Sequence, residues 1–225
     1  MNDLNRRAFR GLLRMALFLA VSVFLPAWTI DYWQGWVCLG LFLACATGIS
    51  LYLMKNDPKL LERRISAGAG AEKEKSQKII QILAAMAFVA TFVVPALNHR
   101  FLWSVVPTYA VIAGDALIVL GFLFVFWVFR VNSFTSGIIE VAAEQRVISN
   151  GPYGLVRHPM YLGALILLIG IPIALGSWWG VLTLLPMTGV ILWRLLDEEK
   201  FLTRNLPGYA EYRQTVKYRL VPFAW

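Results

Sequence analysis

Long apolar runs dominate this chain and limit what it can fold into. Of its 225 residues, 59% are hydrophobic, which is above the roughly 45–50% apolar content of an ordinary soluble domain. Six segments approach the ~20 residues that a helix needs to cross ~30 Å of hydrocarbon: residues 11–30, 33–54, 79–97, 105–129, 160–176 and 179–196. The last two are short, so they form either two tilted spans or a hairpin that does not fully cross. The sequence therefore predicts an all-α polytopic membrane protein with about six transmembrane helices.

The basic residues predict how these helices are oriented. Of the 21 Lys and Arg residues, all but Arg100 lie in the N-terminal arm, in the loops after the second and fourth runs, or from the end of the sixth run onward. Cytoplasmic loops of membrane proteins carry the Lys and Arg excess. We therefore expect both termini and the 131–158 loop to face the cytoplasm. The net charge of +8 then attracts anionic membrane lipids, and no segment outside the predicted spans is large enough to bind nucleic acid.

The chain divides into two parts by the distribution of its polar motifs. Residues 1–104 contain three predicted spans and one polar insert, residues 55–78. Within this insert, residues 58–65 predict a short surface helix, and the Gly- and Ala-rich remainder predicts a flexible cytoplasmic loop. Residues 105–225 contain the remaining spans and every motif with a chemical implication, so we expect the active site there.

A polar segment directly precedes the fifth apolar run. Gly151-Pro152 predicts a turn, and Pro159 suits the first turn of a new helix, where its missing N–H costs nothing. His158 then falls at the helix N-terminus, where free backbone N–H groups favour an anionic group. The structural alternative is a capped helix start in which the Arg157 side chain extends to lipid headgroups.

A second cluster of charges, Arg194-x-x-Asp197-Glu198-Glu199, ends the sixth run. Arg194 and Glu198 share one helical face at i, i+4 spacing. An ionisable group so close to hydrocarbon is costly, so Arg194 requires an anion. That anion is either Glu198, in a weak surface ion pair, or a substrate.

These elements recur in a known order. They are Gln145-Arg146-Val147-Ile148, Gly151-x-Tyr153, Arg157-His158-Pro159-x-Tyr161, an apolar hairpin, Arg194, Glu198-Glu199, Tyr209-x-Glu211-Tyr212 and Pro222. In this order and spacing they resemble the isoprenylcysteine carboxyl methyltransferase family. That family is part of a wider group of integral-membrane methyltransferases that includes bacterial phospholipid N-methyltransferases. The resemblance covers about the last 110 residues, and Gln145 departs from the family in standing where His is common.

The resemblance implies an S-adenosyl-L-methionine pocket formed by the 145–161 segment, the hairpin and the helix end at Glu198. The cofactor-binding residues that it implies are Gln145, Arg146, Val147, Ile148, Tyr153, His158, Pro159, Met160, Tyr161 and Glu198. Arg194 would face the substrate and is the candidate catalytic residue, and no metal is implied. The residue types agree with this assignment. The Glu198 carboxylate suits the cofactor's ammonium or ribose hydroxyls, and the ring of Tyr153 or Tyr161 suits a cation or the adenine.

The expected reaction is methyl transfer to a lipophilic or lipidated acceptor. A carboxylate acceptor such as isoprenylcysteine needs no general base, whereas an amine must first lose a proton and only His158 offers a neutral base. The sequence therefore favours a carboxylate over a phospholipid amine. A Rossmann-type methyltransferase is excluded, because no Gly-x-Gly-x-x-Gly stands between a strand and a helix.

Two other functions remain possible at the sequence level. The C-terminal region of membrane sterol-type reductases, which bind NADPH, is similar to this family's, although a phosphate-bearing cofactor would favour more basic residues than Arg130, Arg146 and Arg157. A small transporter would place polar groups near the bilayer midplane. Here only Asp115 lies well inside a span, where it is either a hydrated residue near the outer interface, paired with Arg100, or part of a polar relay.

Overall fold

The computed structural model describes residues 3–66, 68, 70, 72, 74–142 and 144–225. Throughout these residues the regular secondary structure is helical and no strand is formed, which confirms the predicted all-α class. The elements are α1 (Asp3–Ala27), α2 (Trp33–Asn56), α3 (Pro58–Ile65), α4 (Lys75–Phe101), α5 (Thr108–Val131), η1 (Gly151–Gly154), α6 (Pro159–Ala174), α7 (Trp178–Val181), α8 (Leu184–Asn205) and α9 (Tyr209–Thr215).

Five helical stretches in the described residues are long and apolar enough to cross a membrane: α1, α2, α4, α5 and the stretch Trp178–Asn205, which joins α7 to α8. The predicted C-terminal hairpin is therefore unequal. Its first helix, α6, has 16 residues, so it is about 24 Å long at 1.5 Å per residue and shorter than ~30 Å of hydrocarbon. The protein is an integral membrane protein with one short helix inside its bundle.

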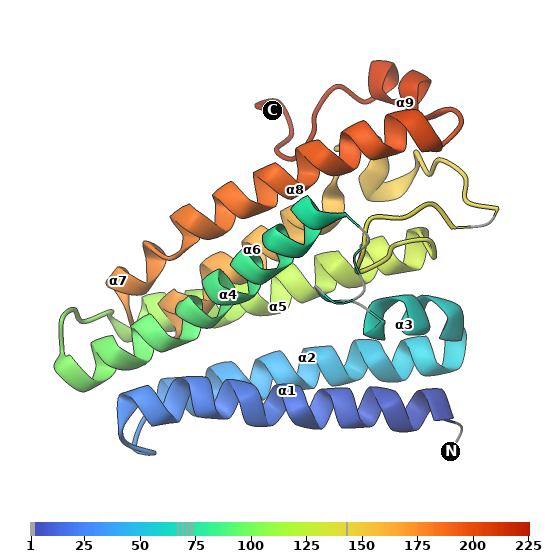
Figure 1. Cartoon of the computed structure of the whole chain (residues 1–225). Coiled ribbons are helices and arrows are strands. Elements are labelled where there is room, and N and C mark those ends of the chain that lie inside the picture. Colours follow the sequence, from blue (N-terminus) through green and yellow to red (C-terminus); the bar gives the residue numbers. More distant parts are fainter. Residues whose placement is uncertain (1–2, 67, 69, 71, 73, 143) are drawn as a thin grey trace.

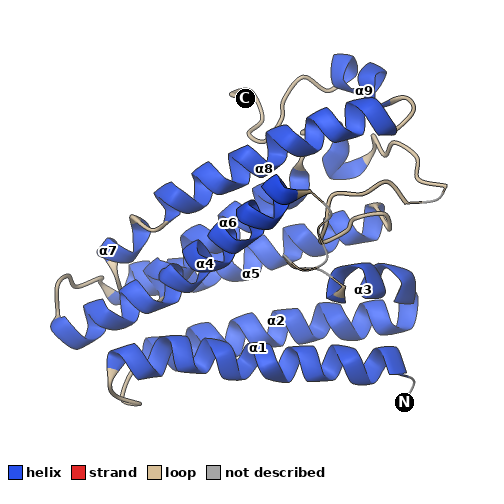
Figure 2. Cartoon of the chain, viewed as in Figure 1, coloured by secondary structure: helices blue, strands red, loops and turns tan. Residues whose placement is uncertain are grey.

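The loops are sorted between the two ends of the bundle. Figure 1 shows the N-terminus, α3, the segment between α5 and α6, and α9 at one end, and the turns between α1 and α2, α4 and α5, and α6 and α7 at the other. Figure 2 shows that the long loop between α5 and α6 lies beside the end of α8. The basic segments predicted to share one side thus lie together, and their assignment to the cytoplasm stays a prediction.

Glycines allow α5 and α6 to pack closely. A Cβ atom on Gly170 would lie 2.6 Å from the carbonyl oxygen of Gly114, and one on Gly121 would lie 2.6 Å from the Leu167 Cβ. Both separations are shorter than van der Waals contact, so only glycine fits at these crossings. Small residues permit such close approach in membrane helix pairs. Because α5 ends and α6 begins beside the long loop, their contact fixes the two helix ends from which the site is built.

The short helix predicted at 58–65 is present, but it is docked rather than free on the surface. The Asp57 carboxylate accepts a hydrogen bond from Leu60 N at 3.0 Å, which caps the helix. Leu60 and Leu61 are buried, and α3 packs against α1 and α2.

The loop predicted for the rest of the insert falls partly on residues 67, 69, 71 and 73, which lie outside the described residues. Two parts of that prediction were wrong. Residues 75–78 begin α4, and the Glu72 side chain is only 2% exposed, because it is drawn into the site described below.

Asp115 lies in α5 without the expected partner. It is buried, and within the described residues its Oδ1 atom has no hydrogen-bond partner. The Arg100 guanidinium instead lies over the rings of Trp28 and Phe101, at 5.3 and 5.1 Å from their centroids. The expected Asp115–Arg100 pair is therefore not formed, and Asp115 is buried rather than hydrated.

Candidate active site

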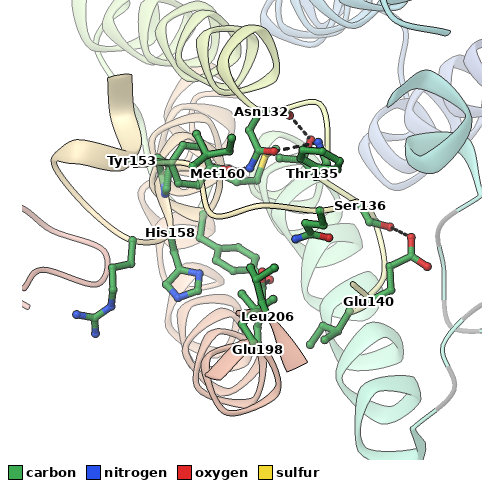
Figure 3. A pocket seen from close by; sticks show the side chains of 18 of the residues that line it. Asn132, Thr135, Ser136, Glu140, Tyr153, His158, Met160, Glu198 and Leu206 are labelled. Carbon is green, nitrogen blue, oxygen red and sulfur yellow. Dashed lines mark hydrogen bonds between the residues drawn. The ribbon is translucent and has the colours of Figure 1, made fainter. Parts of the chain in front are cut away.

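A cavity of about 460 Å³ opens where α3, the long loop, α8 and α9 meet, a size that suits a small-molecule ligand. All eleven residues predicted to bind the cofactor or act in catalysis line it: Gln145, Arg146, Val147, Ile148, Tyr153, His158, Pro159, Met160, Tyr161, Arg194 and Glu198. Figure 3 shows Tyr153, Met160 and His158 on one side of the cavity and Ser136 and Glu140 on the facing side. The structure thus brings together residues that lie up to 53 positions apart in the sequence, from Gln145 to Glu198, and their individual roles stay predictions.

The start of α6 is held by the C-terminal tail. The backbone N–H groups of Arg157 and His158 donate to the carbonyl oxygens of Tyr218 and Arg219, each at 2.9 Å. The N–H of His158 is therefore already used and is not available to an anion. The prediction that this N–H group is free at the start of the helix was wrong. These bonds hold the 157–158 backbone against the tail at the edge of the cavity.

Arg157 is a buried structural cation. Its Nε donates to Glu199 Oε1 at 2.6 Å, and its Nη1 donates to the carbonyl oxygens of Val216 and Lys217 at 2.9 Å. The second oxygen of Glu199 accepts from Arg219 Nε at 2.9 Å. The alternative in which Arg157 extends to lipid headgroups was therefore wrong, because its side chain is buried and bound to a carboxylate of the protein. That carboxylate lies 42 positions away in the sequence. Removal of one member of a buried group of paired charges leaves an uncompensated charge inside the protein and strongly destabilises the fold.

Tyr161 connects Arg194 with Glu198. Its hydroxyl donates to Glu198 Oε2 at 2.6 Å and accepts from Arg194 Nε at 3.2 Å. The simple i, i+4 ion pair between Arg194 and Glu198 is thus replaced by a bridge through the tyrosine hydroxyl.

The Arg194 guanidinium is neutralised from the polar insert. Its Nη1 donates to Glu72 Oε1 at 2.9 Å and to Gln77 Oε1 at 3.3 Å. Its Nη2 donates to the Gly137 carbonyl oxygen at 3.0 Å. With Tyr161 as a further acceptor, Arg194 uses most of its planar set of donors within the protein. Arg194 therefore organises one wall of the cavity.

Sequence reasoning missed the side of the cavity opposite the motifs. This side includes Arg64 on α3, Gln81 on α4, Asn132 and the loop residues 134–140. Asn132 Nδ2 donates to the Tyr153 hydroxyl at 2.9 Å, so it also orients a residue that was predicted. The polar insert that supplies Arg64 and Glu72 was visible in the sequence, but nothing local to it indicates that it faces a motif more than 70 residues away.

Two polar atoms at the cavity are left without a partner in the described part of the chain: His158 Nε2 and the Tyr209 hydroxyl, both buried. His158 Nε2 lies 3.4 Å from Glu199 Oε1 but lacks hydrogen-bond geometry. Burial raises the pKa of the Tyr209 hydroxyl above its usual value, so this group remains a hydrogen-bond donor at physiological pH. A buried polar atom without a partner lowers the stability of the fold, and a ligand that bonds to these two atoms would remove that cost. No cluster of three or more His, Cys, Asp or Glu residues suited to a metal occurs in the described ranges.

Part of the chain is similar to known proteins. A 90-residue stretch is 30% identical to the Delta(14)-sterol reductase TM7SF2 of Mus musculus, covering 39% of this chain and 22% of that protein. The chain thus spans about a fifth of that relative's length. Residues 109–207 match the sequence model of the phospholipid methyltransferase family, and all eleven predicted site residues lie inside this range. The resemblance derived from the motifs is therefore confirmed for residues 109–207, which match the phospholipid methyltransferases, one branch of the group of integral-membrane methyltransferases.

Proposed function

We propose that this protein transfers a methyl group from S-adenosyl-L-methionine to a lipophilic acceptor. The observation that carries the proposal is the convergence of all eleven predicted site residues on one cavity, inside the stretch that matches a methyltransferase family. The cavity lies at the end of a bundle of apolar helices, where a polar cofactor and a membrane-dissolved substrate both have access.

The cavity residues fit this cofactor. Glu198 makes no ion pair in the described residues, so its carboxylate is available to the cofactor's ammonium or ribose hydroxyls. His158 Nε2 and the Tyr209 hydroxyl supply unpartnered polar atoms. The rings of Tyr153 and Tyr161 supply aromatic faces for a cation or for the adenine. Gln145, Arg146, Val147 and Ile148 form the remaining wall, and Pro159 and Met160 close it at the start of α6.

When bound, the cofactor supplies an electrophilic methyl group on a positively charged sulfur. A lone pair of the acceptor forms the new bond to the methyl carbon while the carbon–sulfur bond breaks, and its electron pair stays on sulfur as a neutral thioether. The protein's contribution is alignment and exclusion of water, which supplies ~7–11 kcal/mol in well-oriented reactions. A carboxylate such as that of an isoprenylcysteine needs no base, so it is the acceptor that we propose first.

His158 supports a second candidate acceptor, a phospholipid amine. An amine must lose a proton before or during the transfer, and His158 Nε2 is an unpartnered nitrogen at the cavity. The family matched by residues 109–207 is named for phospholipid methylation. Measuring methylation of phosphatidylethanolamine beside that of N-acetyl-S-farnesylcysteine separates the two acceptors.

A reductase receives less support from the charges of the cavity. The phosphates of NADPH need several free cations, yet two of the four arginines that line the cavity are already paired, Arg157 with Glu199 at 2.6 Å and Arg194 with Glu72 at 2.9 Å, which leaves Arg64 and Arg146. The likeness to the sterol reductase also covers only 22% of that protein.

Binding of the demethylated cofactor, S-adenosylhomocysteine, tests the proposal directly. Calorimetry on purified protein in a nonionic detergent is expected to show saturable binding, and the cofactor is expected to raise the melting temperature. Absence of binding by both S-adenosylmethionine and S-adenosylhomocysteine, with stabilisation by NADPH, would assign the site to a reductase instead. Transfer of radiolabelled methyl groups to a total membrane extract, followed by chromatography, then identifies the acceptor.

A further inference from the structure

Arg64 is a cation inside the cavity that the motifs do not include. It stands in the last turn of α3 and lines the cavity together with Val125 and Met160. Its Nη1 donates to the Ser136 carbonyl oxygen at 3.0 Å, and its guanidinium lies 5.3 Å from the centre of the Phe129 ring. The side chain therefore lies between an apolar helix face and the polar loop.

The positive charge of Arg64 has no counter-charge among the described residues. In the part of the chain that the structure describes, no carboxylate lies within ion-pair distance of its guanidinium, whereas Arg157 and Arg194 each have one. The remaining cavity arginine, Arg146, is exposed and so can be neutralised by solvent. Arg64 is partly buried, and even partial burial of an unpaired charge is unfavourable.

The surroundings add to this imbalance. Burial is the largest influence on the Arg64 guanidinium and lowers its pKa, and the positive charge of Arg194 lowers it further, while Tyr161 and Tyr153 act in the opposite direction. Arginine nevertheless remains protonated in proteins. A permanent charge is thus kept in a partly apolar cavity without a counterion, and an anionic ligand would supply one.

We propose that Arg64 binds the anionic headgroup of the lipophilic acceptor, either the carboxylate of a lipid-linked acid or the phosphate of a phospholipid. This assignment rests on the proposed function, because it takes the bound lipid to be the methyl acceptor. A planar guanidinium fork grips either group through two parallel hydrogen bonds. Arg194, for which this role was predicted, already spends its donors on Glu72, Gln77, Gly137 and Tyr161. Arg64 therefore binds the acceptor, and Arg194 positions the wall beside it.

Arg63 is a matched control within the same helix. Its Nη1 donates to the Ser133 carbonyl oxygen at 2.7 Å, and its guanidinium lies 5.5 Å from the Phe134 ring. It thus makes the same two kinds of contact as Arg64, a hydrogen bond to a carbonyl oxygen of the same loop and a contact with a phenylalanine ring, but it does not line the cavity. Arg63→Gln measures the cost of losing an anchor to the loop, and Arg64→Gln adds the loss of the cavity charge.

Probes that differ only in headgroup charge test the proposal. Binding of oleate and oleyl alcohol, and of dioleoyl phosphatidic acid and dioleoylglycerol, is measured on the full-length protein in nonionic detergent. Wild type and Arg63→Gln are expected to bind at least one anionic probe about tenfold more tightly than its neutral partner. Arg64→Gln is expected to lose this preference, and Arg64→Lys, which keeps the charge without the fork, to retain part of it. Preference for oleate alone identifies a carboxylate site, and preference for phosphatidic acid alone identifies a phosphate site.

S-adenosylhomocysteine binding, measured on the same samples, separates this inference from the proposed function. Its affinity is expected to be the same in Arg64→Gln as in wild type. An equal loss of anion preference in Arg63→Gln and Arg64→Gln, or no preference in wild type, overturns the assignment. So does an Arg64→Gln protein that loses cofactor affinity and keeps anion preference. If no variant binds the cofactor but anion binding still depends on Arg64, the anion site stands and methyl transfer falls.

Discussion

Arg194 forms its ion pair with Glu72, 122 positions earlier in the chain, although Glu198 stands one helical turn away on the same helix. The Tyr161 hydroxyl occupies the place between Arg194 and Glu198. Arg194 is thereby neutralised from outside its own helix. This leaves the Glu198 carboxylate, alone among the acidic groups of α8, with no cation at ion-pair distance in the described residues.

Replacement of Glu198 by Gln is expected to weaken S-adenosylhomocysteine binding by about tenfold or more, because the amide keeps the volume and loses the charge that a charge-assisted hydrogen bond needs. The melting temperature is expected to stay within a few degrees of wild type. Isothermal titration calorimetry and thermal denaturation on one preparation give both quantities. Unchanged affinity in a folded Glu198→Gln protein would remove Glu198 from the cofactor site.

The neighbouring change, Glu199→Gln, is expected to act on stability. The Glu199 carboxylate is buried between Arg157 and Arg219, at 2.6 and 2.9 Å, and removal of one member of a buried pair costs ~3–5 kcal/mol. We expect a fall in melting temperature that greatly exceeds that of Glu198→Gln, with proteolysis of the C-terminal tail as a second readout. A Glu199→Gln protein as stable as wild type would show that the tail is held by its backbone bonds alone.

Glu72→Gln is expected to lower turnover several-fold while cofactor affinity changes little. Arg194 would lose its counter-charge, and the cavity wall around Gly137, which Arg194 holds by a hydrogen bond, would lose its anchor. Glu74→Gln is the matched control: it removes the same charge two residues away, from an exposed side chain. Initial rates with radiolabelled S-adenosylmethionine measure the effect. Equal rates for the two variants would make the Glu72–Arg194 pair irrelevant to catalysis.

Gly170→Ala is expected to destabilise the protein by ~1–3 kcal/mol, the usual cost of forcing extra volume into a packed contact. The new methyl group would lie 2.6 Å from the Gly114 carbonyl oxygen. Gly189→Ala serves as the control, since nothing lies within 4 Å of a Cβ at that position and alanine favours a helix. Chemical denaturation in mixed micelles is expected to rank Gly189→Ala at or above wild type and Gly170→Ala below it.

The sequence predicted the helices better than their ends. Apolar runs report the thickness of hydrocarbon that a helix crosses, not where its hydrogen bonding stops. Helix α1 therefore begins at Asp3 and α4 at Lys75, each several residues before the apolar run that predicted it. Polar residues continue a helix outside the membrane at little cost, so hydropathy carries no signal there.

The site was predictable where it is local in sequence and unpredictable where it depends on packing. The motif residues from Gln145 to Tyr161 lie within one segment, and α8 returns Arg194 and Glu198 to that segment. The partners of Arg157 and Arg194, by contrast, are Glu199 and Glu72. Which carboxylate meets which guanidinium depends on how the helices pack side by side, and a single sequence does not encode that in any local spacing.

The wall of the cavity formed by the predicted site residues lies inside residues 109–207, whereas the facing wall also takes Arg64 and Gln81 from helices outside that range. Such a split lets natural selection treat the two walls separately. Substitutions on α3 and α4 can alter the side of the cavity that holds Arg64 and Gln81 while the opposite wall is unchanged. A cavity built in this way can acquire a different ligand preference through α3 and α4 alone, without any change in the stretch that carries the predicted site residues.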